Sequence, residues 1–214
     1  MYAFTGTVVG IRCKDGIALA SDSRGAYRYL VVSKSVRKLF KLEKQIGAAI
    51  SGSSGDVQSF VNVLKAEANL YRLNHERPIT TKGLAQVAAN MLHGARIFPY
   101  LVAAVLAGVD EGTPSLFFLD PIGGKLEEEI FASAGTGETI AYGVLEQNYR
   151  DDMKLSDGLK LAAQSIKTAI ERDAATGDKI VVTVIDEKGY RELSEDEIEK
   201  LVKKDPVFQR VPPG

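Results

Sequence analysis

The alternation of apolar strand-like groups with pairs of amphipathic helices is the feature of this sequence that most restricts its fold. Strand-rich stretches at residues 6–51, 100–134 and 179–186 are separated by helix pairs expected at 57–73 with 78–95 and at 137–148 with 156–172. A helix buries one stripe and a sheet buries its faces, so each strand group needs a helix pair on one side and another sheet on the other. The order predicts an α+β fold, a four-layer α-β-β-α sandwich.

The spacing of apolar residues supports this assignment. In the first expected helix, large side chains recur at helical intervals, as at Val57, Phe60, Leu64 and Tyr71. A charged final helix is expected at 195–203. With no repeat, linker or low-complexity block, residues 1–214 are expected to form a single domain, in which 1–5 are a short leader or extension and 205–214 a flexible tail.

Composition restricts the function classes. A formal net charge of −1 gives no basic surplus for nucleic acid. The single cysteine, Cys13, excludes an internal disulfide framework, fits a reducing compartment, and is expected to be buried in the first strand. Neither a run of about 18 apolar residues nor a signal-peptide pattern is found. These observations predict a soluble, cytoplasmic protein that does not bind membranes.

The opening of the chain and a series of later blocks resemble the β-type subunits of the proteasome, the archaeal ones above all. Mature chains of that family begin Thr-Thr-Thr-Val-Gly and continue into a hairpin like the one expected around Lys14-Asp15-Gly16. The resemblance extends from Thr5 to about Asp186 in matching order and spacing. The blocks that carry it include Asp22-Ser23-Arg24, Arg37-Lys38-Leu39-Phe40, Ser51-Gly52-Ser53-Ser54-Gly55-Asp56, Phe98-Pro99-Tyr100-Leu101, Asp120-Pro121-Ile122-Gly123-Gly124 and Arg172-Asp173-Ala174-Ala175-Thr176-Gly177.

The resemblance implies the fold and chemistry of the N-terminal nucleophile hydrolases, in which a first threonine attacks the carbonyl and its own α-amine acts as base. By position, it assigns Lys38 as the active-site lysine, Asp22 as the carboxylate that holds it and Gly52 as the backbone N–H donor to an oxyanion. Thr136, Asp173 and Thr176 match residues that support the amine, with threonines replacing serines at 136 and 176. Simpler interpretations are a solvated Lys38, a turn role for Asp22, and capping or turn roles for Thr136, Asp173 and Thr176.

The nucleophile position itself departs from the family. Counting back from Gly10-Ile11 places Gly6 where the threonine belongs, and glycine has no hydroxyl. A shift by one residue along a strand turns each side chain to the other face, so neither Thr5 nor Thr7 fits the register. Thr7 stays open as an alternative nucleophile because family maturation cleaves between a glycine and the threonine, and Gly6-Thr7 imitates that dipeptide. A native threonine replaced by engineering would leave the same sequence.

The resemblance also implies a substrate pocket, lined by Gly25, Val36, Phe40, Ile50 and Ser54. Because these residues are neutral, a working site would favour hydrophobic residues before the cut. No cofactor and no metal are expected.

The leading hypothesis is a catalytically silent β-ring subunit of a 20S-like proteasome core particle in ATP-dependent protein degradation. Its expected partners are other β subunits, the α ring and unfolded polypeptide substrate. The alternatives are an active threonine endopeptidase trimmed to Thr7 (or Thr5) and a free-standing relative with the same fold. The α-type subunits are disfavoured because no helix pattern precedes the first strand.

Overall fold

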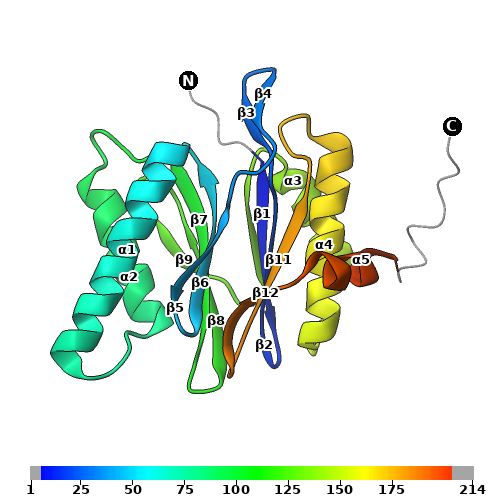
Figure 1. Ribbon diagram of the computed structural model, residues 1–214. Coiled ribbons are helices and arrows are strands. Elements are labelled where there is room, and N and C mark those ends of the chain that lie inside the picture. The colour runs from blue at the N-terminus through cyan, green and yellow to red at the C-terminus, as the bar shows by residue number, and fades with distance from the viewer. Residues whose placement is uncertain (1–5, 204–214) are drawn as a thin grey trace, which may run out of the picture.

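The computed structural model describes residues 6–203 and confirms the four-layer α+β sandwich. Two antiparallel five-stranded sheets face each other, and helices cover the outer face of each (Figure 1). The expected leader at 1–5 and tail at 205–214 lie outside the described residues. None of the helices between residues 6 and 203 has the length and apolar content needed to cross a membrane.

Each sheet is built around long, apolar central strands. The first sheet has the order β10 (Phe131–Gly135), β1 (Thr7–Cys13), β2 (Gly16–Asp22), β11 (Ile180–Asp186) and β12 (Gly189–Glu192). The second has the order β5 (Leu39–Glu43), β6 (Ile46–Gly52), β7 (Val102–Asp110), β8 (Thr113–Leu119) and β9 (Lys125–Glu127). In both, the central strands are buried on both faces, which agrees with their nearly continuous apolar sequences.

The helices form two outer layers. On one side, α1 (Ser54–His75) and α2 (Thr81–Gly94) lie over the second sheet. On the other, α3 (Glu138–Asn148), α4 (Leu155–Arg172) and α5 (Glu195–Lys203) lie beside the first sheet (Figure 1). The hydrophobic core therefore has three layers, two between a sheet and its helices and one between the sheets.

Short strands account for most differences from the sequence prediction. The sequence pattern singles out no strand at β3 (Gly25–Tyr27), β9 or β12, while the β-rich run at 29–33 predicts a strand where β4 (Leu30–Ser33) is found. β3 and β4 pair only with each other and form a separate two-stranded hairpin at one end of the sandwich (Figure 1). The sequence pattern also predicts a strand at 36–42, but β5 begins only at Leu39, because the residues before it turn toward the end of β2, where the Val36 N–H donates to the Ser23 carbonyl.

Candidate active site

One end of the sandwich collects the residues that the resemblance assigned to catalysis. Gly6 precedes β1, Asp22 ends the neighbouring strand β2, and Lys38 lies just before β5 of the other sheet. The Thr7 N–H donates to Asp22 Oδ1 at 2.9 Å, which fixes the beginning of β1 against the end of β2. The structure thus brings together Gly6, Asp22 and Lys38, each of which is about 16 residues from the next along the chain.

Lys38 and Asp22 form a buried ion pair. The Lys38 Nζ–Asp22 Oδ1 distance is 2.5 Å, and the side chains are 3% and 0% exposed. The ammonium also donates to the Arg24 carbonyl at 2.8 Å. Burial lowers the pKa of Lys38 from its usual value, and the nearby Asp22 carboxylate opposes this effect. The solvated-surface interpretation of Lys38 is therefore wrong.

The Asp22 carboxylate is held by several donors. Besides Lys38 and the Thr7 N–H, its carboxylate accepts from the N–H groups of Arg24 at 3.0 Å and Gly177 at 2.9 Å. Backbone donors of this kind stabilise the charged form of a carboxylate. The bond to Arg24, two residues on, is also the turn role expected of Asp22, so the two interpretations hold together.

Gly6 lies where a side chain would collide with this ion pair. A β-carbon added at Gly6 would be 1.7 Å from Lys38 Nζ and 2.3 Å from Asp22 Oδ1. The backbone φ of Gly6 is +78°, a conformation that residues with a side chain rarely adopt. The Lys38 ammonium therefore occupies the direction in which a residue at position 6 would project its side chain.

The hydroxyl of Thr7 points elsewhere. Thr7 is fully buried, and its Oγ1 lies 2.7 Å from Thr176 Oγ1. It shares a strand face with Val9, which packs into the core beneath α3 and α4, as alternation along a strand requires. Thr5, the other threonine considered from the sequence, lies outside the described residues.

The remaining positions assigned to the amine form a second cluster beside Thr7. The hydroxyls of Thr136 and Thr176 both donate to Asp173 Oδ2, and the Thr136 N–H donates to the Gly6 carbonyl at 2.9 Å. Asp173 Oδ1 accepts from the Ala175 N–H at 3.1 Å, the turn role that the sequence left open. A chain of hydrogen bonds therefore runs from Thr7 through Thr176 and Asp173 to Thr136.

Gly52 ends β6 at a point where the backbone of the next strand comes very close. A β-carbon there would lie 2.1 Å from the Leu101 carbonyl oxygen, so the position requires glycine. Ser53 N–H donates to the same oxygen at 2.9 Å. Gly52 lines a cavity that Lys38 also borders, which places both on one concave surface.

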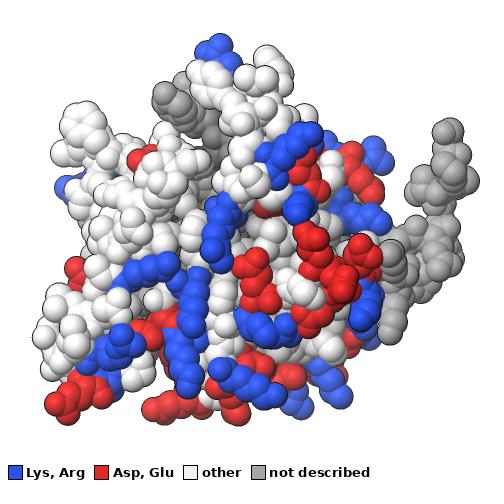
Figure 2. Space-filling view, viewed as in Figure 1, with Lys and Arg blue, Asp and Glu red and all other residues white. Residues whose placement is uncertain are grey.

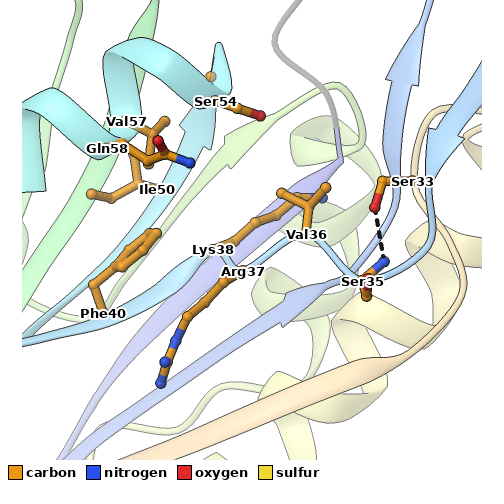
Figure 3. A pocket seen from close by; sticks show the side chains of 11 residues that line it. Ser33, Ser35, Val36, Arg37, Lys38, Phe40, Ile50, Ser54, Val57 and Gln58 are labelled. Atoms are coloured by element: carbon orange, nitrogen blue, oxygen red, sulfur yellow. Dashed lines mark hydrogen bonds between the residues drawn. The ribbon is translucent and has the colours of Figure 1, made fainter.

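The cavity has a volume of about 400 Å³ and lies between α1 and the chain from Ser33 to Phe40 (Figure 3). Val36, Phe40, Ile50 and Ser54 line it, as the resemblance implied. Gly25 does not line the cavity; it lies behind Val36, where a β-carbon would be 2.6 Å from Val36 Cγ2.

Sequence reasoning missed further cavity residues, Ser33, Ser35, Val57 and Gln58 among them. Val57 and Gln58 lie one turn beyond Ser54 on α1, so helical spacing was the available signal. Arg37 borders the cavity, but its guanidinium extends away from the apolar side chains (Figure 3) and donates to the Leu39 carbonyl and to Glu192. Besides Lys38 and Arg37, the lining therefore combines apolar side chains with serine and glutamine side chains.

Arg24 was not identified as a site residue from the sequence, yet it joins the two clusters. Its carbonyl accepts from Lys38, and its guanidinium donates to Asp178 Oδ2 and to the Ala174 carbonyl, both at 3.0 Å. A β-carbon on Gly177 would lie 2.2 Å from the guanidinium carbon. Arg24 thereby ties the Lys38–Asp22 pair to the 173–178 loop.

Comparison with known proteins identifies the family. The sequence pattern of the proteasome subunit family matches residues 3–185. The chain is 45% identical to proteasome subunit beta 1 of Thermococcus onnurineus, over 92% of this chain and 96% of that protein. It is 43% identical to the proteasome subunit beta of Methanothermobacter thermautotrophicus, over 92% and 93%, and 41% identical to proteasome subunit beta 2 of Pyrococcus furiosus, over 92% and 95%. The chain therefore belongs to the proteasome subunit family and is of the β type.

Proposed function

We propose that this chain is a β-ring subunit of a 20S-like core particle and does not itself cleave peptide bonds. The observation that carries the proposal is the position of Gly6. Its absent side chain would point at the Lys38–Asp22 pair, where the family's mechanism needs a threonine hydroxyl. Without that hydroxyl no covalent acyl intermediate can form at this position.

The other positions that the resemblance assigns to catalysis support the proposal. Lys38 pairs with Asp22 beside Gly6, and Lys38 and Gly52 both line the cavity. In this proposal these groups keep structural roles: Asp22 holds the start of β1, and the Asp173 cluster holds the loop at Thr136. In an active subunit the same cavity would favour hydrophobic residues before the cut.

The competing proposal, an endopeptidase that uses Thr7 after trimming, has less support. Cleavage between Gly6 and Thr7 would leave a free amine on the residue that carries the hydroxyl, 2.9 Å from Asp22 Oδ1. The Thr7 hydroxyl, however, is fully buried and hydrogen-bonded to Thr176, on the strand face that packs under α3 and α4. A nucleophile in that place could not reach a peptide in the cavity.

In the proposed role the subunit completes a β ring beside catalytic β subunits, against an α ring, in a cytoplasmic particle that degrades unfolded polypeptides with ATP-dependent assistance. The names of its relatives, proteasome β subunits, support the place in a β ring.

The intact mass of the chain recovered from the assembled particle tests the proposal. We expect the Gly6–Thr7 bond to be uncleaved. A chain that begins at Thr7 would contradict the proposal that this subunit is catalytically inactive, and it would favour the endopeptidase that uses Thr7.

A further inference from the structure

The amine of Lys38 lies where the resemblance places the side chain of the attacking threonine. Its Nζ is 1.7 Å from the position of a β-carbon on Gly6, so a nitrogen, and not a hydroxyl, occupies that space. Lys38 also lines the cavity, together with Gly52 (Figure 3). A catalytically inactive subunit therefore keeps a nucleophilic group, which peptide hydrolysis does not use, beside the cavity.

The hydrogen bonds of Lys38 leave one direction at its nitrogen open. An ammonium can donate three hydrogen bonds, and among residues 6–203 it has two acceptors, Asp22 Oδ1 at 2.5 Å and the Arg24 carbonyl at 2.8 Å. A neutral amine has two N–H groups, so the same acceptors satisfy both of them. The lone pair is then left in the third direction, and a lone pair is what attacks a carbonyl carbon.

The surroundings of Lys38 favour the neutral amine. Its side chain is 3% exposed, and burial lowers its pKa, although the Asp22 carboxylate opposes that effect. Asp22 also accepts from three backbone N–H groups, so its negative charge does not depend on a proton from Lys38 alone. Lysines that are desolvated in this way are the ones that form Schiff bases with carbonyl compounds.

The cavity determines which carbonyl compounds fit. It has a volume of about 400 Å³, and four apolar side chains contribute to its lining: Val36, Phe40, Ile50 and Val57. An aliphatic or aromatic chain would be removed from water against these side chains, which stabilises the bound compound. An aldehyde with such a chain would thus be held beside the Lys38 amine.

We propose that Lys38 forms an imine with aldehydes that carry an apolar chain. The inference rests on the proposed function, in which no hydroxyl at position 6 competes with Lys38 for the carbonyl carbon.

The reaction balances with the groups that the site supplies. Asp22 takes one proton from the Lys38 ammonium, and the Nζ lone pair forms a bond to the carbonyl carbon, whose oxygen receives a proton from the same nitrogen. Asp22 then returns its proton to the new hydroxyl, which leaves as water while the C=N bond forms. The product is the protonated imine, so the positive charge beside Asp22 is kept and no oxidant or reductant is consumed.

Reductive trapping in the full chain tests the proposal. The chain is incubated at neutral pH with hydrocinnamaldehyde and sodium cyanoborohydride, which reduces an imine to a stable secondary amine. Each adduct adds the mass of the aldehyde less one oxygen and is located by mass spectrometry of peptides. We expect Lys38 to be labelled on the order of tenfold more than Lys41, an exposed lysine of β5, because an exposed amine is almost fully protonated at neutral pH.

The same chain supplies the controls. Lysine and arginine side chains are spread over the surface that Figure 2 shows, so exposed amines serve as internal references. Acetaldehyde has the reacting group without the apolar chain and should label Lys38 with less preference. In urea the preference should vanish, since it depends on the fold. Equal labelling of Lys38 and Lys41 in the folded chain, or a preference that persists in urea, would overturn the proposal.

The inference and the proposed function fail separately. If Lys38 is not preferentially labelled in a chain that also hydrolyses no peptide, the imine fails and the catalytic inactivity stands. If the chain hydrolyses peptides through Thr7 while Lys38 is labelled, the inactivity fails and the imine stands.

Discussion

The Lys38 ammonium fills the direction in which a side chain at Gly6 would point, with 1.7 Å between Nζ and the position of a β-carbon. The lysine pairs instead with Asp22, at 2.5 Å. The ammonium of Lys38 therefore takes the space that a side chain at position 6 would need. Several measurable consequences depend on this pair and on the strand beside it.

Removing Asp22 should cost more stability than removing Lys38. Asp22→Ala leaves an unpaired buried ammonium, which we expect to lower the free energy of unfolding by about 3–5 kcal/mol. Lys38→Met leaves a carboxylate that still accepts from the N–H groups of Thr7, Arg24 and Gly177, so its loss should be smaller. Urea denaturation of both variants and of the double variant measures the difference. Equal losses would show that the backbone donors do not support Asp22.

Gly6→Ala should destabilise the chain by about 1–3 kcal/mol, because a side chain is strained at φ +78° and Lys38 must move. Gly143→Ala in α3 is the matched control: apart from the adjacent backbone of α3 itself, no atom lies within 4 Å of the added β-carbon, and alanine favours helix by about 0.5–1 kcal/mol. The midpoint temperature of thermal unfolding should therefore fall for Gly6→Ala and rise for Gly143→Ala. A Gly6→Ala variant as stable as the unsubstituted chain would disprove the fit between Gly6 and Lys38.

Thr7 should behave as a structural residue. Thr7→Val keeps the shape and removes the hydrogen bond to Thr176, so we expect a loss of about 1 kcal/mol in unfolding free energy. Thr7→Ser keeps the hydroxyl and should retain that bond. Chemical denaturation of the two variants distinguishes the contribution of the hydroxyl to stability from that of the methyl group. If Thr7→Val is as stable as the unsubstituted chain, the hydroxyl has no structural role.

Cys13 should make the folded state less stable at high pH. Burial raises the pKa of its thiol from 9.0 to about 12. Above pH 9 the unfolded chain loses this proton while the folded chain keeps it, so the free energy of unfolding should fall by up to about 1.4 kcal/mol per pH unit until about pH 12. The difference between the unsubstituted chain and Cys13→Ala isolates this contribution from the tyrosines. Identical pH dependence of the two would contradict it.

The sequence predicted the long elements well because their periodicity is strong. The helix expected at 57–73 is α1, Ser54–His75, and the apolar runs at 100–109 and 179–186 are strands β7 and β11. The strands β3, β9 and β12 have only three or four residues, too few to show an alternation of apolar and polar residues. They form because neighbouring strands offer hydrogen-bond partners, which a local pattern does not reveal.

The candidate site was predictable to the extent that its residues lie in short blocks. Asp22 and Lys38 could be selected from such blocks, but the space taken by the ammonium at Gly6 depends on the relative position of two sheets. Val57 and Gln58 enter the cavity because α1 packs beside the segment before β5. Arg24 was missed because its role consists of contacts with residues about 150 positions away.

Peptide hydrolysis by a particle of verified composition, with this chain as its sole β-type subunit, tests the central claim most directly. With a fluorogenic peptide that ends in a large hydrophobic residue, we predict no turnover above that of the buffer. Turnover that disappears in the Thr7→Ala variant would contradict the account and assign the chemistry to Thr7.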